Sequence, residues 1–206
     1  MFWRRGQTDA RDHGAAGSDV LDKRWGDLSR TLAESPCWSH LPPATAAECQ
    51  GVVAAGGYPF TGDVFPGVDF ITDGEELAEG GVEDLLQLMD PALSDHGVAL
   101  RVEVSRLAKS IDDDYVLHIN GRRCLVLDRD DWIYGRPWYD ATVRPLAVVN
   151  DLLVEAGASA RVFTLYTGGN EGAALLLDPQ VIAAVARSGL IDAEDLPVLV
   201  IDDTRL

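Results

Sequence analysis

The segment 115–127 constrains the fold of this chain more than any other part of it. Two runs rich in apolar and β-branched residues, 115–119 and 122–127, are separated by Asn120-Gly121. The tight turn that suits a two-residue hairpin needs positive φ at both central residues, and Asn-Gly adopts it readily. The sequence therefore predicts a β-hairpin here.

Further strands are predicted on both sides of this hairpin. Segment 98–104 alternates between apolar and polar residues, which is typical of a half-buried antiparallel strand. Two apolar runs, 161–166 and 172–177, are joined by a glycine-rich segment that favours a hairpin loop. Together these predict an α+β fold, with a mostly antiparallel sheet of about five strands and helices packed on at least one face.

The helices and the domain boundaries are predicted from periodicity and capping residues. Leu21, Trp25, Leu28 and Leu32 follow helical spacing, and Asp178-Pro179 is a typical helix start. Residues 1–17 lack periodicity and are expected to form a flexible tail. The remainder, 18–206, is expected to be a single α+β domain, in which 18–97 is a mostly helical cover and 98–206 holds the sheet and two helices.

The segment 128–140 is predicted to be a long loop that carries both acidic and aromatic side chains. A further helix is expected over 145–155, with Pro145 at its first turn and its apolar residues on one face. Long loops in compact domains are more often functional than short ones.

The charge of the chain is unusual. It holds 34 acidic and 17 basic residues, for a net charge of −17. No Lys or Arg occurs from residue 31 to residue 100, where 12 acidic residues fall. A field of this sign repels nucleic acid and anionic membranes and attracts cationic partners, although acidity can also serve solubility alone.

Motifs for common chemistries are missing from the sequence. It contains no G-x-x-x-x-G-K-[ST] or G-x-G-x-x-G phosphate loop and no G-x-S-x-G nucleophile elbow. Cys37, His40 and Cys49 do not match a common zinc spacing. We therefore expect no catalytic residues, no metal site and no cofactor.

The expected location is the cytoplasm. The longest apolar runs fall short of the roughly 18 residues that span a bilayer, and the N-terminus lacks the apolar core of a secretory signal. Three cysteines do not form a paired framework, which suits a reducing compartment. No membrane association is expected.

Acidic clusters precede and follow the predicted hairpin, and aromatic residues adjoin the second cluster. Because a hairpin brings its ends together, both clusters should lie at one end of the sheet. Carboxylates interleaved with Trp and Tyr suit a basic, arginine-rich protein partner. The alternative is that Trp132 and Trp138 pack into the core and hold this segment in place, since large aromatic residues are buried on average. The predicted partner-binding residues are Asp112, Asp113, Asp114, Asp128, Asp130, Asp131, Trp132, Tyr134 and Trp138.

In acidity, single-domain size, lack of catalytic motifs and the Asp/Trp/Tyr segment 128–140, the chain resembles the immunity proteins of bacterial polymorphic-toxin systems. The resemblance implies a cytoplasmic, non-enzymatic protein that neutralises a basic toxin domain by occlusion. Two alternatives remain open at this point. The same aspartates could bind Mg²⁺ or Ca²⁺ in a metal-dependent hydrolase, or the chain could be a structural subunit of a bacterial assembly.

Overall fold

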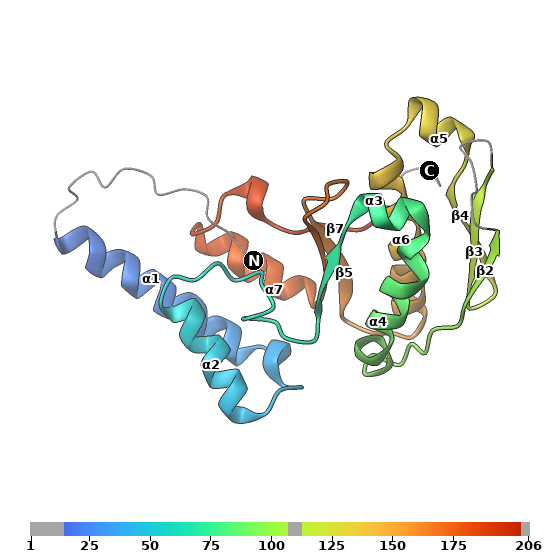
Figure 1. Cartoon of the computed structure of the whole chain (residues 1–206). Coiled ribbons are helices and arrows are strands. Elements are labelled where there is room, and N and C mark those ends of the chain that lie inside the picture. The colour runs from blue at the N-terminus through green and yellow to red at the C-terminus, as the bar shows by residue number, and fades with distance from the viewer. Residues whose placement is uncertain (1–14, 107–112, 203–206) are drawn as a thin grey trace.

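The computed structural model describes residues 15–106 and 113–202, and these fold into alternating layers of helix and sheet (Figure 1). Helices α1, α2 and α7 lie on one side of a four-stranded sheet. Helices α4 and α6 fill the space between this sheet and a second, three-stranded sheet. The α+β class is confirmed, but the strands form two sheets and not the single sheet of about five strands expected from the sequence.

The bounds of the helical elements follow the chain order. They are α1 Ala15–Glu34, η1 Pro36–Trp38, α2 Pro43–Ala54, α3 Gly74–Glu76, η2 Leu77–Gly81, α4 Val82–Ser94, α5 Arg129–Tyr134, α6 Pro137–Glu155, α7 Pro179–Ser188 and η3 Ala193–Asp195. The predicted N-cap of α7 is confirmed, because the Asp178 side chain accepts a hydrogen bond from the backbone N–H of Gln180.

The larger sheet contains β1 Asp69–Thr72, β6 Gly172–Leu177, β5 Arg161–Leu165 and β7 Val198–Leu199, in that spatial order. All of its pairs are antiparallel, and the predicted hairpin of β5 and β6 is confirmed. Strand β1 lies within the segment expected to be mostly helical cover, so the N-terminal part of the chain also supplies an edge of this sheet.

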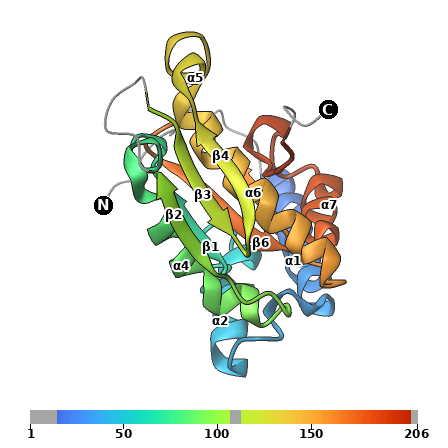
Figure 2. The ribbon, with the colours of Figure 1, turned by 90° about the vertical axis from the view of Figure 1, so that its right-hand side faces the viewer.

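The smaller sheet contains β2 Val102–Arg106, β3 Tyr115–Ile119 and β4 Arg122–Leu127 in that order, all antiparallel (Figure 2). The Asn-Gly hairpin is confirmed, since Asn120 and Gly121 have φ values of 50° and 79°. Strand β2 begins four residues later than the alternating pattern suggested. The reason is that the backbone N–H groups of Leu100 and Arg101 donate to the side chains of Asp90 and Asn120.

Helix α6 is the central element of the fold. It contacts β4 on one side and β5 on the other, so almost every side chain from Ala141 to Leu153 is buried. The helix begins at Pro137 and passes through Pro145, where the sequence had indicated its start. A proline inside a helix removes one backbone hydrogen bond, but burial on all sides offsets that loss here.

Candidate functional site

The two acidic clusters around the hairpin lie at one end of the smaller sheet. Tyr115 pairs with Leu127 at the last position of the β3–β4 ladder. Asp114 and Asp128 directly adjoin this pair, so the segments that precede β3 and follow β4 start side by side. Of the predicted partner-binding residues, Asp112 lies outside the described residues, whereas Asp113 and Asp114 are partly exposed.

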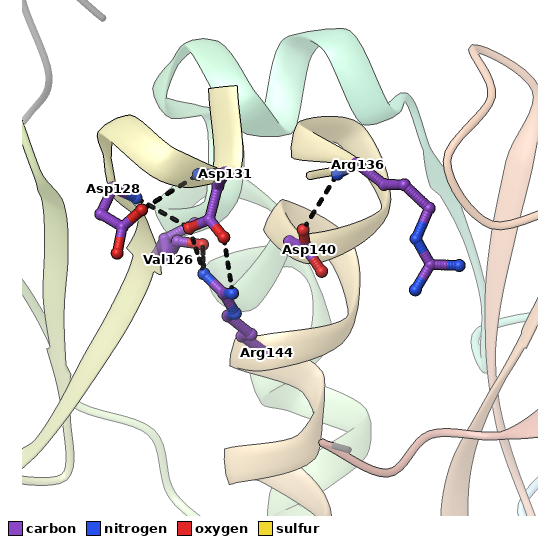
Figure 3. A network of polar contacts seen from close by, with 6 residues as sticks. All are labelled: Val126, Asp128, Asp131, Arg136, Asp140 and Arg144. Carbon is purple, nitrogen blue, oxygen red and sulfur yellow. Dashed lines mark hydrogen bonds and ion pairs between the residues drawn. The ribbon is translucent and has the colours of Figure 1, made fainter. Parts of the chain in front are cut away.

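The segment after β4 is helical, and the prediction of a long loop over 128–140 is wrong. Asp128 and Asp131 form a reciprocal capping box at the start of α5 (Figure 3). The Asp128 side chain accepts from the Asp131 N–H at 3.0 Å, and Asp131 accepts from the Asp128 N–H at 2.8 Å. Two orphan donors of the helix start are thereby satisfied. The signal that could have revealed α5 is the Asp-x-x-Asp spacing itself.

Asp131 also forms an ion pair with Arg144 in the middle of α6 (Figure 3). Its two carboxylate oxygens lie 2.8 Å and 2.5 Å from the two terminal guanidinium nitrogens, and each side chain is only 13% exposed. Arg144 also donates to the Val126 carbonyl at 3.1 Å. A bidentate pair of this kind fixes α5 against α6 and β4.

Asp131 therefore has a structural role within the chain. Burial opposes its ionisation, but the hydrogen bonds from Arg144 and from the Asp128 backbone outweigh burial and hold the pKa of Asp131 below its usual value. Asp128 is likewise engaged as the helix cap. Both carboxylates accept hydrogen bonds within the chain, and that of Asp131 is in addition paired with Arg144.

The predicted aromatic contacts separate into two kinds. Trp132 and Trp138 are partly buried and pack against the hydrophobic core. Tyr134 is 83% exposed at the end of α5, and its neighbour Ile133 is also exposed. Of the aromatic residues predicted to bind a partner, Tyr134 thus presents the largest accessible surface, while the tryptophans anchor the segment to the core.

Helix α3 and the β5–β6 loop join this end of the molecule, which the sequence did not reveal. The Gly74 N–H donates to the Gly169 carbonyl at 3.0 Å, and a side chain at Gly74 would meet the Trp138 Cβ at 2.8 Å. The Asn170 amide lies 3.4 Å from a carboxylate oxygen of Glu75. Close approach at a glycine thus brings α3 against the start of α6.

The result is a surface that we call the acidic end. Figure 1 shows α3 and α5 at the same end of the molecule. The exposed or partly exposed carboxylates that define the acidic end are Glu75, Glu76, Asp113, Asp114, Asp130 and Glu171. Arginines also lie here, and the guanidinium of Arg136 stacks 4.0 Å above the Tyr139 ring. The surface is therefore acidic, with aromatic side chains and a minority of basic groups.

Metal-ligand geometry is a separate question. Within residues 15–106 and 113–202, no group of three or more His, Cys, Asp or Glu side chains is arranged to hold a metal ion.

Among the helices of the same described ranges, none has the length and apolar character that a membrane span requires. Comparison of the chain with protein-family models, curated proteins and solved structures found no significant match.

Proposed function

We propose that this protein is a non-enzymatic binding protein whose acidic end docks onto a basic protein partner. The observation that carries the proposal is that exposed or partly exposed carboxylates from four separate parts of the chain lie at the same end of the molecule as the exposed side chain of Tyr134. Tyrosine is enriched at the energetic centres of protein interfaces, and surrounding charges increase the rate of encounter with an oppositely charged partner.

Occlusion is the proposed mechanism. Carboxylates of the acidic end would occupy the positions where the partner normally binds phosphates or other anions, and Tyr134 would pack against its surface. The general resemblance to immunity proteins supports a toxin domain as the basic partner. The three free cysteines, Cys37, Cys49 and Cys124, are consistent with a reducing compartment such as the cytoplasm.

A charge-reversal experiment tests this proposal. The triple variant D113K/D114K/D130K reverses three charges of the acidic end, and E34K/E48K/D63K makes the same change of net charge at exposed sites on α1, on α2 and in the turn before β1. We expect the first variant to associate on the order of tenfold more slowly with the basic protein partner, because steering depends on local charge.

Stopped-flow measurements at low and high salt provide the readout. The acidic-end variant should also show a weaker dependence of the association rate on salt. The matched control should retain most of the wild-type association rate and most of its salt dependence. Equal association rates for the two variants would reject the acidic end as the docking surface.

A further inference from the structure

Strand β2 is an open edge of the smaller sheet. In the order β2–β3–β4 it pairs on one side with β3, and among the described residues no other strand pairs with it. Its side chains from Glu103 to Arg106 are exposed. An open edge of this kind presents unpaired backbone donors and acceptors to any extended chain that approaches it.

The hairpin geometry shows which backbone groups face outward. Ile119 and Arg122 flank the two-residue turn, and such a pair exchanges hydrogen bonds with each other. By alternation, the backbone groups of His118 point the other way, toward Glu103 of β2. The hydrogen bond from the Asn120 N–H to the Arg101 carbonyl, at 2.8 Å, follows the same alternation.

It follows that the backbone N–H and C=O groups of Glu103 point toward β3. Those of its neighbours Val102 and Val104 point away from β3. These are the groups that an added strand would use. The Val104 side chain is 40% exposed, so the space next to it is open.

A groove runs between this edge and helix α4. A cavity of about 230 Å³ is lined by Leu86, Gln87 and Asp90 of α4 together with Leu100 and Val102. Its apolar floor comes from the leucines and Val102, and its polar wall from the helix. The Asp90 carboxylate holds the Leu100 N–H at 2.7 Å, which fixes the helix to the segment that leads into β2.

The helix wall of the groove is negatively charged. Glu83, Gln87 and Asp90 recur at helical spacing on α4, and Gln87 and Asp90 of this row line the cavity with Val102. Asp84 follows Glu83 on the next position around the helix. The Gln87 amide donates to Glu83 at 3.2 Å, which keeps these side chains in one row. No Lys or Arg occurs between residues 31 and 100, so α4 brings no positive charge to this wall.

We propose that the β2 edge accepts an extended segment of a partner protein that carries Lys or Arg at alternate positions. Backbone hydrogen bonds to Val102 and Val104 would hold the segment as an added strand. Alternate side chains would then point toward Glu83, Asp84 and Asp90 of α4, where cations are favoured. This surface is made of other residues than the acidic end, and its binding does not depend on the function proposed above.

Binding of a labelled peptide to the full chain tests the proposal. The probe is an eight-residue peptide of alternating Thr and Lys with blocked ends, and a peptide with Glu in place of Lys is its counterpart. Fluorescence anisotropy at about 0.1 M salt, where the Debye length is about 10 Å, should detect the lysine peptide only. The variant E83K/D84K should weaken its binding by about tenfold, because the cationic side chains lose their partners.

The matched control is E34K/E48K, which makes the same change of charge at exposed sites on α1 and α2, on the opposite side of the larger sheet from α4. It should leave peptide affinity within about twofold, since charges beyond the Debye length are screened. Equal weakening by both variants would mean that the peptide follows the overall field of the protein, and it would overturn the assignment to the β2 edge.

Amide hydrogen exchange supplies a readout that a purely electrostatic contact would not give. On peptide binding, exchange at Val102 and Val104 should slow at least about fivefold, because those N–H groups become donors to the added strand. A peptide N-methylated at alternate residues should bind poorly. Unchanged exchange at both valines, or a dimer that pairs β2 with β2 and excludes the peptide, would overturn the proposal.

Discussion

Asp131 and Arg144 connect the short helix α5 to the buried helix α6. Both side chains are 13% exposed. Asp131 accepts from the Asp128 N–H at the start of α5, Arg144 donates to the Val126 carbonyl at the end of β4, and the two side chains bond to each other. An ion pair held at this depth stabilises chiefly because removal of one partner leaves the other charged and poorly solvated. Asp131, which the sequence indicated as a partner contact, thus also stabilises the fold.

Loss of Arg144 is expected to destabilise the protein. R144M should lower the free energy of unfolding by about 3 kcal/mol, because it leaves the largely buried carboxylate of Asp131 without its counter-charge. Urea denaturation measures the change. R123M, at an exposed position of β4, is the matched control and should stay within about 0.5 kcal/mol of the wild type. Similar values for the two variants would contradict a structural role for Arg144.

The contribution of Asp131 should depend on pH. The folded state lowers its pKa, so its ionised form stabilises the protein above the unfolded pKa of about 3.9, and this contribution is lost as the pH falls toward the folded value. We expect the difference in unfolding free energy between wild type and D131N to be largest near neutral pH and to shrink below about pH 4. A difference that stays constant from pH 7 to pH 3 would argue against the pair, and D130N serves as the exposed control.

Helix α5 exists because of its cap and its docking, since six residues are too few for a helix that is stable alone. The reciprocal bonds between Asp128 and Asp131 fix its first turn, and Gly135 separates it from α6. The helix carries Asp130 and Tyr134 on a rigid element instead of a loop, which lowers the entropy cost of presenting them to a partner.

Removal of the cap tests this account of α5. D128A should destabilise the protein by about 1 kcal/mol, because the Asp131 N–H loses its acceptor. D130A, two residues later on the exposed side of the same helix, should cost less than about 0.5 kcal/mol. Urea denaturation gives both values, and amide exchange within α5 should rise in D128A alone. An equal cost for the two substitutions would show that the cap is unimportant.

The charge distribution acts on the whole molecule. Ion pairs such as Arg30–Asp27 and Arg122–Glu155 lie near the surface, where each contributes little. They do not offset the net charge of −17 or the 70 residues without Lys or Arg. Self-repulsion therefore opposes the compact state, and the same field attracts cationic partners to both the acidic end and the α4 wall.

Salt should consequently stabilise the folded protein. Between about 20 mM and 500 mM NaCl we expect the free energy of unfolding to rise by about 1 kcal/mol, because screening weakens the repulsion among carboxylates. Thermal or urea denaturation measures this rise. E34K/E48K/D63K, which lowers the net negative charge, should show a smaller rise. Stability that is independent of salt in both proteins would mean that the repulsion is already negligible.

Local features of the sequence were sufficient to predict the Asn-Gly hairpin, the β5–β6 pair, the start of α7 and the uneven charge. Each depends on residues close together in the chain, whose turn conformations and caps are decided by their own side chains. The α+β class followed from the same elements. The roles of Asp128 and Asp131 could not be predicted in this way. The sequence around a carboxylate does not show whether an arginine 13 residues later will reach it.

Only the tertiary structure decided that α4 and α6 lie between two sheets. Asn150 illustrates why: its side-chain amide donates to the carbonyls of Val162 and Val200 and accepts from the Val162 N–H, so it ties α6 to segments 12 and 50 residues away. Periodicity identified one apolar face of α6, whereas both sides of the helix are covered. Burial on the second side depends on contacts between residues that are far apart in the sequence. The local pattern of apolar residues does not reveal such contacts.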